Sequence, residues 1–378
     1  MKIAIVHSFY SQSAPSGENS AVNAQAELLE SAGHEVLLIS RYTDKEAGRP
    51  GYKISAAIAA AGIAGPDPTD EIRTFRPDVV HIHNLFPNWG AGWLRKWGGP
   101  KVATIHNFRT LCSSGLLFRD GESCTECLDH SSVRALKHRC YRESAVATLP
   151  LAWASRSKGA RQPLLHSVDR LILLNEFARS IYAPLTPVPL AVVPNFSLQT
   201  ATPQENRSGF LYVGRLSSEK GAVELAQRFP DWSHLRVIGD GPQVETIKDI
   251  ARASRGSVEY AGRLSHEETM RAVASAEGLI VPSLCTEGIP SVALEAMAHG
   301  TPIIVSDRCV SAGELTAYGN GEIYRPLDSD HLAQKVKSIL EDSQKYRQAS
   351  LSAYIDRYSP GRWLNEITQL YSGVLNVH

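Results

Sequence analysis

The chain has 378 residues, of which 43% are hydrophobic, and its 39 lysines and arginines balance its 39 aspartates and glutamates. A length well above ~150 residues predicts two domains or one large one. The ample hydrophobic content excludes a disordered chain, and the balanced charge means that nucleic acid is not expected as a partner.

The chain begins with a short apolar run at residues 2–6, which predicts a strand buried on both faces. This run is shorter than the ~7–15 residues of a signal-peptide core. The longest apolar stretch, at 54–65, is shorter than the ~20 residues that a membrane-spanning helix needs. We therefore expect a cytoplasmic protein, in which the six cysteines do not build a disulfide framework.

Strand and helix patterns alternate along the whole chain. After a helical pattern at 18–31, strand patterns of the first half follow at 36–39, 77–83, 101–106, 170–174 and 188–193. After the polar stretch 197–208, the second half has strand patterns at 209–214, 235–239, 258–262, 278–281 and 302–305, with helical patterns between them. Such alternation predicts an α/β protein with two doubly wound parallel sheets. A ligand would bind at the carboxyl ends of their strands.

In the second half, two carboxylates flank a predicted helix start. Glu287 and Glu295 are eight residues apart, and Pro290 between them suits the first turn of a helix. The backbone N–H groups that follow Pro290 would be free to bind an anion. An acid beside an anion site fits a ligand that carries both phosphate and hydroxyl groups.

Two cations follow the strand pattern at 209–214. Arg215 and Lys220 could together neutralise a diphosphate, because arginine grips phosphate with two N–H groups and lysine adds a compact charge. A glycine turn at 239–242 follows the next strand, but it lacks the third glycine of a dinucleotide fingerprint. No Asp-x-Asp pair stands at a strand end, so we expect no catalytic metal.

Taken in order, these segments resemble a known family. The segments that carry the resemblance are 213–221, 239–242, 260–262, 282–283 and 287–304. They are similar to the retaining, nucleotide-sugar-dependent glycosyltransferases of family 4 (group 1), which have the GT-B fold. The resemblance covers nearly the whole chain. It implies two Rossmann-like domains that face each other across a cleft, and a C-terminal helix that crosses back to the first domain.

The resemblance also implies domain limits and a reaction. It implies an acceptor domain at 1–195 with an insertion at about 107–142, a donor domain at 196–359, and a tail helix at 360–378. The enzyme would move a hexose with retention from a nucleotide diphosphate sugar to a hydroxyl of a polysaccharide or lipid-linked glycan. A UDP-sugar is the favoured donor, with UDP-glucose as the first choice.

Roles follow from the resemblance position by position. Arg215 and Lys220 match the cations that hold the donor diphosphate, and His106 matches a histidine near the reacting sugar. Glu287 matches the acid that faces the donor sugar; with Arg215, Lys220 and His106 it completes the expected catalytic set. The expected donor-binding residues are completed by Gly17, Arg263, Leu264, Gly288, Ile289, Pro290, Ser291, Val292 and Glu295. Many members have two adjacent glycines where this chain has Gly17 alone.

Other readings of the sequence stay open. A sugar phosphorylase or a nucleotide-sugar epimerase would share the fold and the cleft. A non-catalytic scaffold built on a zinc knuckle is the alternative from another class. The scaffold alternative depends on four cysteines. Cys124 and Cys127 have C-x-x-C spacing, and Cys112 and Cys140 flank them at similar distances, which predicts a structural zinc site. Four reduced thiols or a redox-sensitive loop would have the same sequence.

The charge is uneven in one segment. Residues 131–165 contain seven cations and one acid. This excess predicts either a solvated face or an approach to an anionic membrane and a lipid-diphosphate acceptor. The second prediction would place the enzyme peripherally at the inner face of a membrane.

Overall fold

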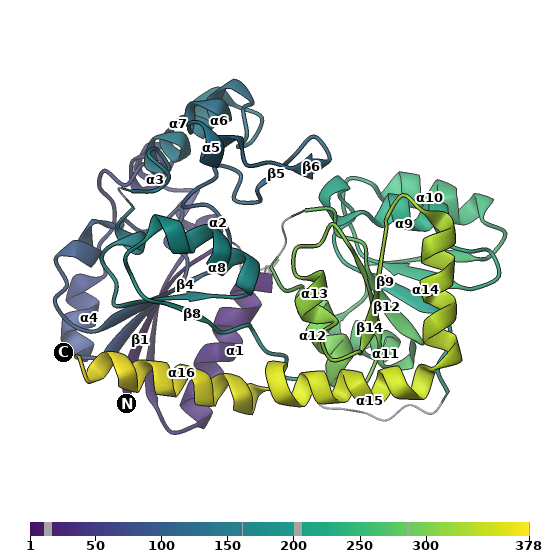
Figure 1. Cartoon of the computed structure of the whole chain (residues 1–378). Coiled ribbons are helices and arrows are strands. Elements are labelled where there is room, and N and C mark those ends of the chain that lie inside the picture. Colours follow the sequence, from purple (N-terminus) through teal and green to yellow (C-terminus); the bar gives the residue numbers. More distant parts are fainter. Residues whose placement is uncertain (11–16, 161, 200–205, 286–287, 378) are drawn as a thin grey trace. The chain divides into compact units, whose positions relative to one another are not determined.

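Figure 1 shows the computed structural model, which describes residues 1–10, 17–160, 162–199, 206–285 and 288–377. The chain folds as two compact units. The first consists of Met1–Leu117, Cys124–Pro194 and Trp363–His378, and the second of Phe118–Ser123 and Asn195–Arg362. The domain limits that we inferred from the sequence remain a proposal.

The first unit contains a six-stranded parallel sheet in the order β2-β1-β3-β4-β7-β8. Its strands are β1 (Lys2–Phe9), β2 (Glu35–Tyr42), β3 (Val79–Ile82), β4 (Lys101–Ile105), β7 (Arg170–Leu173) and β8 (Leu190–Val192). The central strands are apolar and buried on both faces, as parallel strands covered by helices must be. All six were predicted from the sequence, and the α/β fold class is confirmed.

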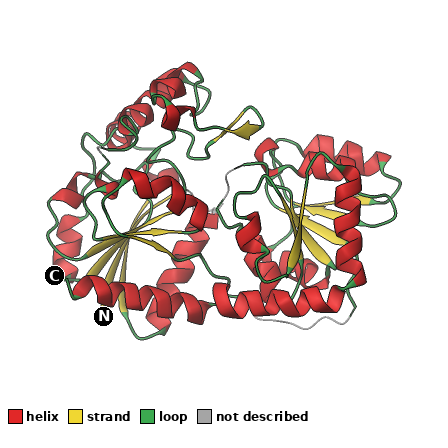
Figure 2. Cartoon of the chain, in the orientation of Figure 1, coloured by secondary structure: helices red, strands yellow, loops and turns green. Residues whose placement is uncertain are grey.

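Helices cover both faces of this sheet (Figure 2). The helices of this part of the chain are α1 (Gly17–Ser31), α2 (Thr43–Glu46), α3 (Tyr52–Ala60), α4 (Thr69–Phe75), α5 (Glu126–Asp129), α6 (Val133–Lys137), α7 (Ala145–Ala154) and α8 (Glu176–Tyr182), with the short turns η1 (Gly92–Arg95), η2 (Pro163–Leu165) and η3 (Ala183–Leu185). Among them, α3, α5, α6 and α7 lie together beyond one end of the sheet (Figure 1). A two-stranded hairpin, β5 (Phe118–Arg119) and β6 (Glu122–Ser123), precedes α5 in the chain and belongs to the second unit. The sequence patterns did not predict this hairpin, because each strand has only two residues.

The second unit contains a parallel sheet in the order β11-β10-β9-β12-β13-β14. Its strands are β9 (Phe210–Val213), β10 (Leu235–Ile238), β11 (Val258–Gly262), β12 (Gly278–Val281), β13 (Ile303–Ser306) and β14 (Gly321–Tyr324). Its helices are α9 (Ala222–Arg228), α10 (Val244–Ala253), α11 (His266–Ser275), α12 (Ser291–Ala298), α13 (Ala312–Leu315), α14 (Ser329–Glu341) and α15 (Ser343–Ala353), with the turns η4 (Ser218–Lys220) and η5 (Tyr354–Tyr358). Five strands were predicted. β14 was missed because its four residues include glycine and glutamate.

The last helix, α16 (Pro360–Leu375), packs on the first unit over most of its length. Its apolar face buries Trp363, Ile367, Tyr371 and Val374 at helical spacing. The Tyr371 hydroxyl hydrogen-bonds to Nδ1 of His81 over 2.7 Å, which ties the helix to β3. Within the described residues, no helix is long and apolar enough to cross a membrane.

Candidate active site

Each parallel sheet has one point at which the order of its strands along the chain reverses. In the first unit the point lies between β1 and β3, and in the second between β9 and β12. Loops diverge at such a point, so the carboxyl ends of the two strands border a natural ligand site. Most of the residues predicted to bind the donor follow β9 or β12, whereas Arg263 and Leu264 follow β11 and His106 follows β4.

In the second unit the loop after β9 carries the two predicted cations. Arg215 is exposed, and Lys220 ends the single turn η4 and is half-buried. Gly221 then adopts a φ of 70°, and a Cβ there would lie 2.3 Å from the carbonyl oxygen of Pro282. Only glycine fits this close approach between the loops after β9 and β12.

A second glycine contact holds the same loop. A Cβ on Gly239 would lie 1.8 Å from the carbonyl oxygen of Gly214, the residue before Arg215. The amide of Leu216 donates to the carbonyl of Asp240 over 2.8 Å. The glycine turn after β10 therefore supports the loop of Arg215 directly, a role that a comparison with dinucleotide fingerprints could not reveal.

The loop after β12 leads into α12, as predicted. Pro290 immediately precedes the helix with a φ of −62°, and α12 begins at Ser291. Gly288 is held by Ser311, whose hydroxyl donates to its carbonyl oxygen over 3.2 Å. The predicted residues Gly288, Ile289, Pro290, Ser291 and Val292 thus form the approach to one helix N-terminus. Glu287 lies outside the described residues.

Glu295 lies one turn into α12 and is half-buried. Burial raises the pKa of its carboxyl above the usual value, and the nearby His266 partly opposes this shift. His266 begins α11, directly after Arg263, Leu264 and the N-cap Ser265. The structure therefore brings the predicted ribose carboxylate close to the segment predicted to meet the nucleobase.

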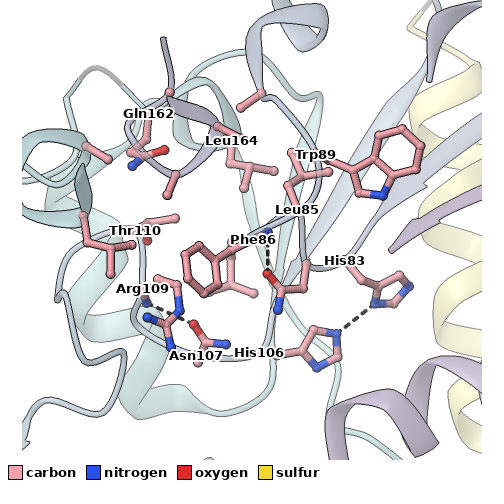
Figure 3. Close-up of a pocket in the computed structure, with 18 of the residues that line it drawn as sticks. His83, Leu85, Phe86, Trp89, His106, Asn107, Arg109, Thr110, Gln162 and Leu164 are labelled. Atoms are coloured by element: carbon pink, nitrogen blue, oxygen red, sulfur yellow. Dashed lines mark hydrogen bonds between the residues drawn. The ribbon is translucent and has the colours of Figure 1, made fainter. Parts of the chain in front are cut away.

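In the first unit, histidines gather at the carboxyl ends of β3 and β4. His83 and His106 share a hydrogen bond of 2.8 Å between Nδ1 and Nε2, with the proton on one of the two rings (Figure 3). His81 contacts Thr104 through Nε2 over 2.7 Å, and its ring centroid lies 4.1 Å from that of His83. The three rings are tilted by 33° and 32° from one to the next and form one contiguous group.

The surroundings keep these imidazoles neutral. Burial lowers the pKa of His81 and of His106 to about 3. Burial and the neighbouring histidines hold the pKa of His83 well below 6.5. At neutral pH, His106 can therefore donate one hydrogen bond and accept another, but it does not offer a positive charge.

A pocket opens beside His106 within the first unit (Figure 3). Glu18, Asn84, Asn107 and Arg109 supply polar groups to its wall. Nδ2 of Asn107 donates to Oε2 of Glu18 over 3.3 Å, whereas Oε1 of Glu18 is shut off from solvent and has no partner among the described residues. Arg109 stacks its guanidinium 4.5 Å from the ring centroid of Phe86.

Glu18 is the main site residue that the sequence analysis missed. Burial raises the pKa of its carboxyl to about 7, although hydrogen bonding to Asn84, the charge of Arg109 and hydrogen bonding to Asn107 all lower it. The sequence signal was its place next to Gly17, which is the first residue of α1. An ionisable group held near neutral pH in a pocket is a candidate functional residue.

Three cysteines of the insertion lie near Cys127. Burial raises the pKa of Cys127 to about 11, and Cys112, Cys140 and Cys124 add to this effect. All four are free thiols. However, no group of three or more His, Cys, Asp or Glu side chains in the described part of the chain is arranged to hold a metal ion. The zinc site stays a prediction.

Two family models match consecutive parts of the chain. The model for Glycosyltransferase Family 4 matches residues 15–196, and the model for Glycosyl transferases group 1 matches residues 197–355. The chain is a family 4 glycosyltransferase. It is therefore an enzyme that transfers sugars, and the family resemblance read from its motifs is confirmed.

Relatives of this glycosyltransferase act on different molecules. It is 26% identical over 363 residues to the phosphatidyl-myo-inositol mannosyltransferase of Mycolicibacterium smegmatis, with 89% of this chain and 84% of that protein covered. It is 26% identical over 298 residues to the glycogen synthase of Mycobacterium tuberculosis, with 71% of this chain and 62% of that protein covered.

Solved structures confirm the GT-B fold of the glycosyltransferase. Sucrose-phosphate synthase from Thermosynechococcus elongatus superposes with a TM-score of 0.70 at 17% identity, and all of both chains is covered. Anabaena HepE, solved in complex with UDP, superposes with a TM-score of 0.60 at 15% identity over 99% of this chain and 100% of that chain.

Proposed function

We propose that this glycosyltransferase moves a hexose from a UDP-sugar to a hydroxyl of a polysaccharide or lipid-linked glycan, with retention of the anomeric configuration. UDP-glucose is the first donor to test. HepE has been solved both with UDP and with UDP and glucose, which supports this choice of base and sugar.

One observation carries the proposal. The loop of Arg215 and Lys220 contacts the loop that leads to the N-terminus of α12. These loops follow β9 and β12, between which the strand order of the second sheet reverses. Cations and helix N-termini both favour a bound diphosphate. Glu295, one turn deeper, is suited to accept hydrogen bonds from the ribose hydroxyls.

The proposed chemistry needs no protein nucleophile. The acceptor oxygen forms a bond to the anomeric carbon on the face from which the diphosphate leaves, and the bond from that carbon to the phosphate oxygen breaks. The acceptor proton passes to the leaving phosphate oxygen. Arg215 and Lys220 stabilise the negative charge that develops there.

The pocket of the first unit supports a role for its polar wall in holding the acceptor. His106, which is neutral at pH 7, can hydrogen-bond a sugar hydroxyl. Glu18 lines the pocket, and its Oε2 accepts a hydrogen bond from Asn107. We propose that the Glu18 carboxyl takes part in binding an acceptor hydroxyl at this wall.

Calorimetric titration tests the donor. UDP, GDP, ADP and NAD are titrated in turn, first without metal and then with magnesium. We expect UDP to bind, and Arg215→Ala to abolish binding, whereas Arg252→Ala, an exposed arginine on α10, leaves it unchanged. A folded protein that binds none of these nucleotides contradicts the proposal. Binding of free phosphate would favour a phosphorylase, and conversion of the donor without acceptor would favour an epimerase.

Activity measurements test the proposed catalytic residues. Lys220→Ala is expected to lose most activity while the protein stays folded, because one of the two diphosphate cations is removed. We expect the same of Glu287→Ala, if that carboxylate faces the donor sugar. Normal turnover by either purified variant would exclude the role assigned to that residue.

We also propose that Cys112, Cys124, Cys127 and Cys140 bind a structural zinc ion. The support is their spacing in the chain and their nearness around Cys127. Elemental analysis of protein purified without chelator is expected to find about one zinc per chain. The control variant Cys309→Ser, which removes a buried cysteine of the second unit, should leave the zinc content unchanged. Zinc-free protein with normal stability contradicts the proposal.

A further inference from the structure

Two helices of the first unit carry large apolar side chains on their outer sides. α3 and α7 pack against each other, with α6 beside them (Figure 1). On α7, Val146, Leu149 and Trp153 are 83%, 54% and 50% exposed, and on α3, Ile54 and Ile58 are 68% and 38% exposed. Their spacings of three and four residues place each row on one face of its helix.

We call these five residues, together with Ile63 just after α3, the α3–α7 face. Ile63 is 70% exposed. A cluster of this kind is unusual on a protein surface that meets only water, and it indicates an interaction site. The question is which partner covers it.

The inner sides of the same two helices line the pocket beside His106. Ala59 and Ala60 of α3 and Leu151 and Ala154 of α7 are part of its wall. The α3–α7 face and the pocket are therefore opposite sides of one pair of helices. A molecule anchored at this face would be within reach of the pocket.

Positive charge is concentrated in the segments that form and flank the α3–α7 face. Residues 133–158 contain six cations and one acid, and residues 52–63 contain one cation and no acid. The exposed cations are Lys53, Arg134, Lys137, Arg139, Arg142 and Lys158. In addition, the guanidinium of Arg156 lies 3.8 Å from the ring centroid of Trp153. A tryptophan next to a cation is typical of side chains at the boundary between lipid and water.

We propose that the α3–α7 face docks on a bilayer with anionic headgroups, from which the pocket receives a lipid-linked acceptor. Apolar side chains would enter the acyl boundary while the surrounding cations meet the headgroups. A second copy of the chain fits less well, because a twofold contact through this face would bring like charges together. The choice of acceptor rests on the proposed function, whereas the docking itself does not.

Vesicle flotation of the full chain tests the docking. The probes are phosphatidylcholine vesicles with and without about one third phosphatidylglycerol, each at low and high salt. We expect flotation only with the anionic vesicles and less of it at high salt. Leu149→Asp is expected to weaken binding more than tenfold, and Lys137→Gln about fivefold, as for one cation near an anionic surface.

Two controls make the result specific. Trp232→Ala, which removes a 55% exposed tryptophan of the second unit, should leave flotation unchanged. Leu149→Asp should still bind UDP by calorimetry, so that lost docking is separated from misfolding and from failure of the donor assignment. The proposal is overturned if the anionic vesicles do not bind the protein, or if Leu149→Asp binds them normally. A dimer in solution that Leu149→Asp dissociates would also overturn it, because the face would then meet a second copy.

Discussion

Replacing Glu18 by glutamine should stabilise the protein at alkaline pH. The substitution keeps the shape of the side chain and removes its ionisation. In the folded chain, Glu18 has a pKa of about 7, because burial outweighs the hydrogen bonds and the arginine nearby. The ionised form predominates at alkaline pH, and its burial lowers the free energy of unfolding. A buried amide carries no charge and does not have this cost.

The size of this effect follows from the pKa values. The usual glutamate pKa is 4.5 and the folded value is about 7, and each pKa unit corresponds to about 1.4 kcal/mol. The penalty above pH 7 is therefore roughly 3 kcal/mol. The N-terminal amides of α1 oppose it by up to about 1 kcal/mol, so burial still decides the sign. The stabilising contribution of the protonated carboxyl is fully present below pH 4.5 and is lost as the pH rises through 7.

Urea unfolding of the wild type and Glu18→Gln at pH 5 and pH 8.5 measures the prediction. The advantage of the variant is expected to grow by roughly 2–3 kcal/mol between these two pH values. Glu27→Gln, an exposed position on the same helix, is the matched control and should show no such growth. If Glu18 holds the acceptor, the stabilised variant will also be less active. A variant that is less stable than the wild type at pH 8.5, or a difference that does not depend on pH, would refute the burial argument.

Three further predictions concern the two sheets. In urea unfolding, Gly239→Ala should destabilise the second unit by about 3 kcal/mol or more, because its Cβ would lie 1.8 Å from the carbonyl oxygen of Gly214. The control is Gly33→Ala, at a φ of 84° with no atom within 4 Å of the added Cβ. It should cost only about 1 kcal/mol. Tyr371→Phe should cost about 1–2 kcal/mol by removing the hydrogen-bond partner of buried His81, and an unchanged melting temperature would contradict this. Acidification should destabilise the protein, because the buried histidines have folded pKa values far below 6.5. Their contribution to the free energy of unfolding is fully present above pH 6.5 and falls as the pH drops, by roughly 2–3 kcal/mol for one histidine at pH 4.5. Melting temperatures that rise from pH 7 to pH 4.5 would contradict this prediction.

The proposed donor side of the site could be predicted from the sequence because its residues are close together in the chain. Arg215 and Lys220 lie in one loop, and the segment from Gly288 to Glu295 forms one loop and one helix start. In a parallel sheet, the position of a residue directly after a strand already places it at the carboxyl edge. The hydrophobic patterns in turn predicted five strands of the second sheet and all six of the first.

The proposed acceptor side could be described only from the tertiary structure. Glu18 and Asn107 are 89 residues apart in the chain, and no local pattern predicts that they share a hydrogen bond. The raised pKa of Glu18 and the lowered pKa of His106 arise from burial, which is a property of the folded pocket. Likewise, the sequence predicted a basic segment, but only the packing of α3 on α7 decided which apolar side chains stay exposed beside it. Composition and periodicity determine the elements and the edge at which ligands bind, whereas contacts between distant residues decide the charge state and the shape of the site.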